Sequence, residues 1–301
     1  MRLLIAGGTG LIGTALAKSL LEDGHSVLLL ARGWHPSHLL DGATSGRWDG
    51  RTTSGWGELV NQIDAVVNLA GENLSHWPWT KAQKGRFWDS RVNAGQALIE
   101  AIRMASPRPK VLIQISGINH YGLRGDPADE TTPPGDDFLA RLTVAWEDAT
   151  QEVESLGVRR AVVRQAVVLA RDGGLLPLMA LPVRLFVGGP IGGGRQAVPW
   201  VHVEDVVSAL RFLLENESAR GPYNLVAPQP TSNAAFYRAL AGALKRPYWF
   251  PAPAFLLRWV LGGLSDLVVE GRYSSPRRLL ESGFKFKYEN VEDALNDIYA
   301  A

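Results

Sequence analysis

A glycine-rich turn near the N-terminus constrains the fold more than any other feature of this sequence. Residues 7–13 read Gly-Gly-Thr-Gly-Leu-Ile-Gly, between an apolar run at residues 3–6 and a stretch with apolar residues at helical spacing. Glycines at positions 7, 10 and 13 allow a tight strand-to-helix turn, close backbone approach to an anion, and close packing of helix on strand. Such a turn points free amides and the positive helix end at a diphosphate. The alternative is a glycine turn that serves packing alone.

Strands and helices alternate through the first half of the chain. Short apolar runs predict buried parallel strands at residues 27–30, 66–69, 111–115 and 161–163. Apolar stripes at helical spacing predict helices at residues 11–23, 80–104 and 137–155. This alternation is typical of an α/β protein with a Rossmann-type, doubly wound parallel sheet.

The pattern changes after about residue 170, where paired glycines, a glycine triplet and frequent prolines interrupt the chain. We expect residues 1–170 to form a dinucleotide-binding domain and residues 171–301 to form mainly a smaller C-terminal substrate lobe. Residues 200–225 are expected to return to the first domain through a helix. The glycine-rich residues 188–194 indicate either a flexible loop that closes over a ligand or a simple connector.

The composition excludes several classes of protein. Lys and Arg number 31 against 30 Asp and Glu, so no charge excess favours nucleic acid or an anionic membrane surface. The absence of cysteine excludes disulfides, thiolate catalysis and zinc–thiolate sites. Four apolar residues before the first glycine are too few for a signal-peptide core, and no apolar run approaches the ~20 residues that span a bilayer. We expect a cytoplasmic protein, or one of an organelle matrix, with a small-molecule substrate and no metal.

The end of the second predicted strand distinguishes the two nicotinamide dinucleotides. An NAD site usually carries Asp or Glu there, to bind the ribose 2′-hydroxyl. This sequence has Ala31 and Arg32 instead, and its first carboxylate after that strand is Asp41. Because a guanidinium pairs well with a 2′-phosphate, the sequence predicts NADP rather than NAD. The alternative is an ordinary surface arginine.

Several longer motifs resemble a known family. They are Asn-Leu-Ala-Gly-Glu-Asn from Asn68, Asp-Ser-Arg-Val from Asp89, Pro-Gly-Asp-Asp-Phe at residues 134–138, Gly-Gly-Pro-Ile-Gly at residues 188–192, and Pro-Trp-Val-His at residues 199–202. With the glycine-rich turn, Tyr121-Gly122 and Arg164, they resemble the extended short-chain dehydrogenase/reductases, the NAD-dependent epimerase/dehydratase family. Within it, the chain is similar to an atypical subgroup called epimerase family proteins. The resemblance covers nearly the whole chain.

The turn, the strand ends and this resemblance together predict the residues that contact the cofactor. The resemblance places the pyrophosphate on the turn, the adenine ribose beside residues 69–71, and the nicotinamide beside residues 165–168. The expected contacts are Gly7, Thr9, Gly10, Leu11, Ile12, Gly13, Ala31, Arg32, Leu69, Ala70, Gly71, Arg91, Ser116 and Gln165.

The usual catalytic centre of the family is missing. Typical members use Tyr-x-x-x-Lys, in which the lysine lowers the tyrosine pKa, together with a Ser or Thr four residues before the Tyr-Gly pair. The tyrosine position falls at Leu139, the lysine position at Thr143 and the serine position at Gly117. Neither Leu139 nor Thr143 can exchange a proton with a substrate.

Nearby residues are candidate substitutes. Tyr121 and Ser116 are our catalytic candidates, and His120 has a suitable unperturbed pKa of ~6.5 for proton exchange. The alternatives are a packed aromatic at Tyr121, a turn cap at Ser116 and an exposed histidine. Arg91 shares a helix stripe with apolar residues, so it needs an anionic partner, either a ligand group or an internal carboxylate.

Two hypotheses about function remain. The first is an NADP-dependent oxidoreductase or epimerase acting on a small carbonyl or sugar-like substrate, with the cofactor carrying the chemistry. The second is a non-catalytic regulatory or sensor protein that binds NADP(H) without turnover. The missing tyrosine and lysine favour the second hypothesis, whereas a complete groove and a second lobe favour the first.

Overall fold

The structure, a computed structural model, contains one large parallel sheet with helices on both faces. It describes residues 1–33, 40–249 and 269–300, together with residues 251, 253, 255, 259 and 262–265. The large sheet has seven strands in the order β3-β2-β1-β4-β5-β6-β9, and every neighbouring pair is parallel. The expected doubly wound α/β fold is confirmed.

The strands are short and mostly buried on both faces, as in other parallel sheets. Their bounds are β1 Arg2–Ala6, β2 Ser26–Ala31, β3 Thr44–Arg47, β4 Ala65–Asn68, β5 Val111–Gly117, β6 Arg159–Gln165 and β9 Gly221–Leu225. The chain runs outward from β1 to β2 and β3, and then outward on the other side from β4. The strand order therefore reverses between β1 and β4, and such a switch point opens a crevice at the carboxyl ends of the strands.

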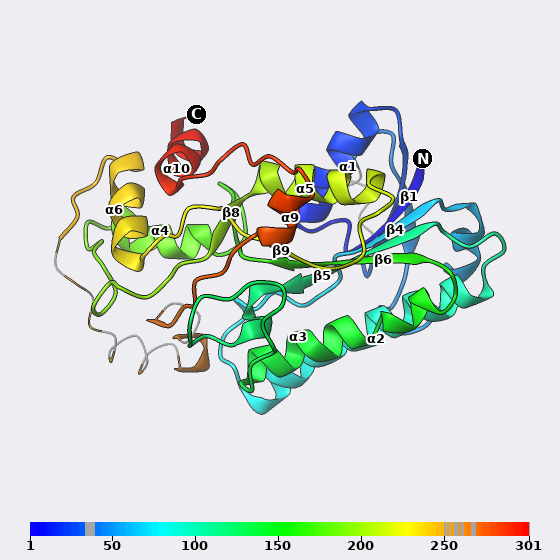
Figure 1. Cartoon of the computed structure of the whole chain (residues 1–301), viewed down its shortest axis with the longest axis horizontal. Coiled ribbons are helices and arrows are strands. Elements are labelled where there is room, and N and C mark those ends of the chain that lie inside the picture. The colour runs from blue at the N-terminus through cyan, green and yellow to red at the C-terminus, as the bar shows by residue number, and fades with distance from the viewer. Residues whose placement is uncertain are drawn as a thin grey trace.

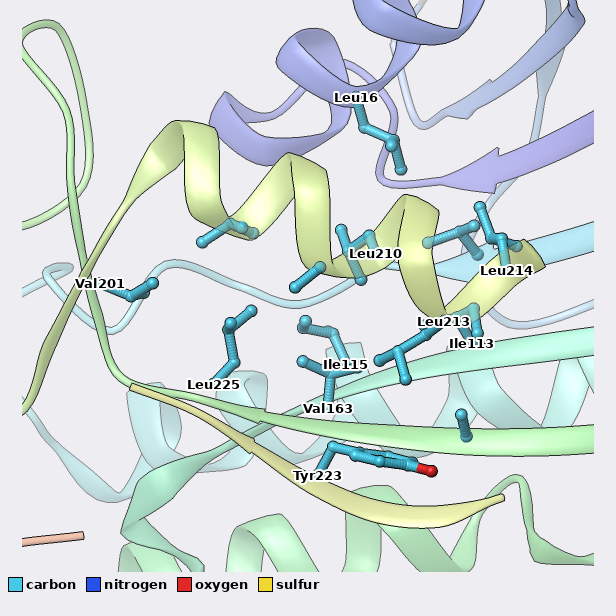
Figure 2. Close-up of a cluster of buried hydrophobic side chains, with 14 of the residues drawn as sticks. Leu16, Ile113, Ile115, Val163, Val201, Leu210, Leu213, Leu214, Tyr223 and Leu225 are labelled. Atoms are coloured by element: carbon cyan, nitrogen blue, oxygen red, sulfur yellow. The ribbon is translucent and has the colours of Figure 1, made fainter. Parts of the chain in front are cut away.

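Four helices cover the sheet. Helices α1 (Leu11–Glu22) and α5 (Val203–Glu215) lie on one face, and α2 (Lys81–Met104) and α3 (Phe138–Asp148) lie on the other (Figure 1). Figure 2 shows the leucines of α5 directed at apolar side chains of β5, β6 and β9, including Ile115, Val163 and Leu225. This packing joins residues 203–225 to the N-terminal sheet.

Helix α3 is shorter than its apolar pattern predicts. It ends at Asp148, and a 3₁₀ turn at Gln151–Glu154 follows. The carbonyl of Glu147 accepts hydrogen bonds from the Thr150 amide and from Thr150 Oγ1, each at 3.2 Å, and from the Arg160 guanidinium. A tightened backbone turn and two side chains therefore satisfy this carbonyl where the helix ends.

A second core lies beside the large sheet. It contains the two-stranded sheet of β7 (Val167–Leu169) and β8 (Trp200–His202), together with α4 (Leu176–Arg184), α6 (Asn233–Ala243) and α10 (Val291–Ala300), at one end of the molecule (Figure 1). The short helix α9 (Arg277–Glu281) packs against β9. The carboxylate of Asp205 in α5 accepts hydrogen bonds from the backbone amides of Lys287 and Tyr288, at 2.7 and 3.0 Å, and so ties α5 to the segment before α10.

The glycine-rich residues 188–194 are held in place by α6. The backbone amide of Ile191 donates to Asn233 Oδ1 at 2.8 Å, and the carbonyl of Gly194 accepts from Ala234 at 2.9 Å. These bonds match the connector interpretation. Within the described residues, no helix combines the length and the apolarity needed to cross a membrane.

Candidate functional site

A groove lies at the switch point between β1 and β4. This groove has a volume of about 600 Å³. Its floor and walls come from the segments that follow β1, β2, β3 and β4, and from α2. Eight residues predicted to contact the cofactor line it: Gly7, Thr9, Gly10, Ala31, Arg32, Leu69, Ala70 and Gly71.

The glycine-rich turn has the geometry that its sequence predicts. Gly7 has a φ of +75°, and a Cβ there would lie 2.9 Å from the carbonyl carbon and oxygen of Leu69. A Cβ on Gly13 would lie 2.6 Å from both Gly7 O and Gly8 Cα. Glycine is therefore required at both positions, at Gly7 by backbone conformation and crowding and at Gly13 by close packing.

The N-terminus of α1 has no side-chain cap, so a ligand can reach its first amides. Gly10 is the N-cap residue, so no side chain caps the helix, and the first turn carries no acidic residue. Thr9 and Gly10 are exposed, whereas Leu11 and Ile12 are half-buried in the first helical turn. The first amides of a helix without a side-chain cap are available to an anion, and the helix dipole favours negative charge there.

The loop after β4 is held by a buried amide pair. Asn68 Oδ1 accepts a hydrogen bond from the backbone amide of Ala70 at 3.2 Å, and Asn68 Nδ2 donates to Gln114 Oε1 of β5 at 2.8 Å. On the other side of the loop, Ser90 Oγ of α2 accepts from the amide of Glu72 at 2.9 Å. These contacts hold the loop that begins the Asn-Leu-Ala-Gly-Glu-Asn motif, because Asn68 binds the amide of Ala70 and Ser90 binds the amide of Glu72.

Several lining residues were missed by sequence reasoning. They are Leu30, Trp48, Asp49, Gly50, Arg51, Glu72, Arg86, Asp89, Ser90 and Ala94. Residues 48–51 follow β3, a four-residue edge strand with no apolar run to reveal it. Glu72 lies within a recognised motif, but only the fold shows that its pKa is lowered, first by a hydrogen bond from His76 and also by the charge of Arg32.

Arg91 is buried, as its helical position predicts, but its partners are different. Its Nη1 donates to Phe87 O at 3.0 Å and its Nη2 donates to Glu72 O at 3.1 Å. The guanidinium also stacks over the Trp146 ring at 4.6 Å. Burial lowers the Arg91 pKa to about 10. The hydrogen-bond partners of Arg91 are therefore carbonyl oxygens, while the charge of Glu72 favours the charged guanidinium. The predicted contact of Arg91 with a cofactor stays a prediction.

Gln165 ends β6 with an unused acceptor. Its Oε1 is buried and has no hydrogen-bond partner among the described residues. Buried polar atoms without partners are uncommon in native proteins, and a ligand donor is one explanation. Gln165 lies outside the main groove, at the end of the strand beside β5, where the resemblance places the nicotinamide.

A buried polar cluster fills the space beneath the carboxyl ends of β5 and β6. Arg164 forms a two-pronged pair with Glu147, with Nε to Oε1 at 2.9 Å and Nη2 to Oε2 at 2.8 Å. Ser116 Oγ donates to Glu147 Oε1 at 2.8 Å. Arg164 Nη1 donates to the Tyr121 hydroxyl at 2.9 Å, and that hydroxyl donates to Asn224 Oδ1 at 2.7 Å. Burial opposes the Glu147 charge, but the bonds and charge of Arg164 outweigh it and hold the pKa below its usual value.

These contacts place the two predicted catalytic residues inside the protein. Tyr121 and Ser116 are each only 1% exposed, and both hydroxyls are used by the cluster. Burial raises the Tyr121 pKa, against a partial opposing effect of Arg164, which is the reverse of the shift that a catalytic tyrosine needs. The geometry favours a structural role for both residues, and their catalytic role stays a prediction.

The three positions of the usual catalytic centre come together in the fold. Leu139 and Thr143 lie one turn apart in α3, and both are buried. Thr143 Cγ2 lies 3.5 Å from the position that a Cβ on Gly117 would take. Thr143 Oγ1 donates within its own helix to Ala140 O at 2.8 Å, and Leu139 belongs to a small apolar cluster with Phe87. The three positions therefore lie close together, but none of them carries a side chain that can exchange a proton.

His120 is buried rather than exposed. Its Nδ1 lies 3.4 Å from Glu147 Oε1 without forming a hydrogen bond, and its ring packs edge-on against Tyr121. Burial lowers the His120 pKa to about 4, although the Glu147 charge opposes that change. His120 is thus neutral near pH 7. Among the described residues, no group of three or more His, Asp or Glu side chains is placed to hold a metal ion.

Comparisons with known proteins agree with this geometry. A model of the NAD dependent epimerase/dehydratase family matches residues 3–226, and a domain of unknown function (DUF1731) matches residues 252–298. The chain is 38% identical to the epimerase family protein SDR39U1 of Bos taurus, with all of both chains covered. It is 35% identical to the epimerase family protein YfhF of Bacillus subtilis, covering all of this chain and 98% of that one.

A solved structure is similar over the same length. The human epimerase family protein SDR39U1, isoform 2, crystallised with NADPH, superimposes with a TM-score of 0.89 and 36% sequence identity. The match covers all of this chain and 99% of the human one. Both lobes therefore have counterparts in that protein.

Proposed function

Because this chain belongs to the NAD dependent epimerase/dehydratase family, we propose that it binds NADP(H) in the groove and exchanges hydride with a small carbonyl or sugar-like substrate. The observation that carries the binding proposal is the pairing of an uncapped α1 mouth with Arg32 in one groove. The similarity to a human protein crystallised with NADPH supports it.

The residues present fit such a cofactor. The glycines of the turn at residues 7–13 let its backbone pack tightly against itself and against the loop after β4. The first amides of α1, which no side chain caps, are free to bind an anion. Arg32 is exposed at the end of β2, where a 2′-phosphate is expected. Gln165 Oε1, which is buried and has no partner among the described residues, can accept from a carboxamide donor at the nicotinamide end. When bound, the cofactor supplies hydride transfer, while the protein binds and orients it.

The buried cluster restricts what this chain can add to that chemistry. With Leu139 and Thr143 in place of tyrosine and lysine, no described group at that position exchanges a proton with a substrate. Glu147, Arg164, Ser116 and Tyr121 form a rigid support beneath the strand ends. The proposal therefore favours substrates that take up or lose a proton from solvent.

The same observation favours a second candidate function. A protein that binds NADP(H) as a signal needs the groove but needs no acid–base centre. The replacement of both acid–base positions by Leu139 and Thr143 is what favours such a regulatory or sensor role.

Substitution of Arg32 tests the binding proposal. We expect Arg32→Asp to weaken NADPH binding at least 100-fold, because it replaces an attraction for the 2′-phosphate with a repulsion, and to weaken NADH binding only a few-fold. Fluorescence titration of the bound nicotinamide measures both affinities. Equal losses for the two dinucleotides would remove the 2′-phosphate role of Arg32.

A turnover assay separates the two candidate functions. Purified protein is incubated with NADPH and a panel of carbonyl compounds and nucleotide sugars, and the absorbance of NADPH is followed. Oxidation above background supports the oxidoreductase, whereas tight binding without oxidation supports the sensor. Because the Tyr121 hydroxyl is buried, we expect Tyr121→Phe to keep any turnover within about threefold of wild type. Complete loss of turnover in this variant, with unchanged NADPH affinity, would restore Tyr121 as a catalytic residue.

A further inference from the structure

Two arginines from different strand ends line the same part of the groove. Arg32 follows β2, and Arg51 lies four residues after the end of β3. Gly50 has a φ of +72°, and the position of its missing Cβ lies 3.9 Å from Arg32 Cδ. The turn that carries Arg51 therefore lies directly against the aliphatic part of Arg32.

Several hydrogen bonds fix the conformation of the turn at residues 49–52. The Asp49 carboxylate accepts hydrogen bonds from the amides of Arg51 and Thr52, at 2.7 and 2.8 Å, and from Thr52 Oγ1 at 2.8 Å. These bonds lower the Asp49 pKa. Trp48 donates its amide to Ala31 O at 3.2 Å, and Trp56 Nε1 donates to Thr52 O at 2.7 Å. Both ends of the turn are thus fixed, and so is the backbone from which the Arg51 side chain projects.

The two guanidinium groups differ from the other charged side chains of the groove in their hydrogen bonds, although the charge of Arg32 acts on Glu72 and lowers its pKa. Within the described part of the chain, neither the Arg32 nor the Arg51 side chain forms a hydrogen bond or an ion pair. Arg86 differs, because its guanidinium donates to Gln83 and lies 3.9 Å from a Glu72 oxygen. Glu72 is further engaged by His76 at 3.1 Å.

The carboxylates of the groove lie elsewhere or are already used. Asp49 is bound within its own turn, and Glu72 is bound by neighbours on its own side of the groove. Asp89 belongs to the wall that α2 supplies. Two cations that share one edge of a groove and pair with no described residue repel each other, and a doubly charged anion relieves that repulsion. The favoured anion position is therefore the β2–β3 edge.

We propose that Arg51 is the second arm of a two-guanidinium site, with Arg32 as the first, for the phosphomonoester on the adenine ribose of NADP(H). Guanidinium groups suit this ligand, because their planar donors match phosphate oxygens two at a time. The inference rests on the proposed function, since it assigns a specificity residue to the same groove. It adds a residue from a different strand end, which the resemblance did not indicate.

Titration of three proteins with NADPH and NADH tests the assignment. The proteins are wild type, Arg51→Ala and the matched control Arg47→Ala, which removes an equal charge from an exposed residue of β3 outside the groove. We expect Arg51→Ala to raise the Kd for NADPH about tenfold and the Kd for NADH less than twofold, as for one solvent-screened, charge-assisted contact. Arg47→Ala leaves both within twofold. Arg51→Lys recovers part of the NADPH affinity, because it keeps the charge and loses the planar fork.

The possible results separate this inference from the proposal beneath it. If Arg51→Ala prefers NADPH over NADH as strongly as wild type does, the role of Arg51 is overturned and the proposed function stands. Equal weakening of both dinucleotides also overturns it, because Arg51 would then contact a part that they share. Wild-type protein that binds neither dinucleotide overturns both proposals together. Competition gives support that is independent of the nicotinamide. The inference is supported if 2′,5′-ADP competes with NADPH in wild type, 5′-AMP does not compete, and competition by 2′,5′-ADP is weaker in Arg51→Ala.

Discussion

The crevice at the carboxyl ends of the strands has two halves that differ in structure. The open half is the groove beside β1, and the closed half is the buried polar cluster at β5 and β6. At the β1 end, backbone groups define the site, and no described side chain hydrogen-bonds to the first α1 amides or pairs with the two guanidinium groups. At the β5 and β6 end, the polar side chains bind one another around the Glu147–Arg164 pair. An open site can receive a ligand, whereas a closed cluster supports the fold. The contrast indicates a chain that keeps dinucleotide binding and lacks the family's usual acid–base chemistry.

Removal of Glu147 is expected to give the largest effect and to show how far the closed half supports the fold. Glu147→Ala leaves Arg164 buried without a counter-charge, so we expect the free energy of unfolding to fall by about 3–5 kcal/mol. Urea denaturation followed by circular dichroism measures this change. The control Glu152→Ala breaks an exposed pair with Arg103 and should cost less than about 1 kcal/mol. Similar small losses in both variants would contradict the structural role of the cluster.

A methyl group at Gly13 tests the open half. In Gly13→Ala the new Cβ meets Gly7 O and Gly8 Cα at 2.6 Å, so the turn must shift. We expect a loss of about 1–3 kcal/mol in unfolding free energy and at least a tenfold weaker NADPH affinity. The control Gly85→Ala, in α2, adds a methyl where nothing lies within 4 Å and should stabilise by roughly 0.5–1 kcal/mol. Unchanged NADPH binding in Gly13→Ala would show that the turn does not hold the dinucleotide.

The pH dependence of the free energy of unfolding also tests the closed half, and the expected effect is smaller. The folded pKa of His120 is about 4 and its ordinary value is 6.5, so the unfolded chain takes up a proton first as the pH falls. The neutral, buried histidine therefore disfavours the folded state progressively between pH 6.5 and 4, by about 1–2 kcal/mol at pH 5. Chemical denaturation at pH 7.5 and 5 measures the difference, which we expect to be smaller in His120→Gln. His202, whose pKa is also lowered by burial, contributes in both proteins. An identical pH dependence in wild type and variant would contradict the buried, neutral state of His120.

The features that were predicted from the sequence depend on residues that are close together in the chain. The turn at residues 7–13 is local, because the strand, the glycines and the helix follow one another, and Arg32 comes directly after its strand. The missing catalytic pair is also visible, since Leu139 and Thr143 occupy fixed steps along one helix. These features needed only spacing and the chemistry of each residue type.

The features that were missed depend on contacts between distant parts of the chain. Arg51 enters the groove because β3 pairs with β2, and the short, polar β3 has no pattern that predicts a strand. Tyr121 was expected to face a substrate, but its hydroxyl bonds to Asn224, 103 positions away. Arg91 faces inward as predicted, yet its partners are carbonyl oxygens, which no side-chain pattern reveals.

Side-by-side calorimetric titration of the folded wild-type protein with NADPH and NADH tests the central claim most directly. The open half, with its uncapped helix and its two guanidinium groups, predicts saturable binding of NADPH at least tenfold tighter than that of NADH. Absence of binding by both dinucleotides, or equal affinity for the two, would contradict the account.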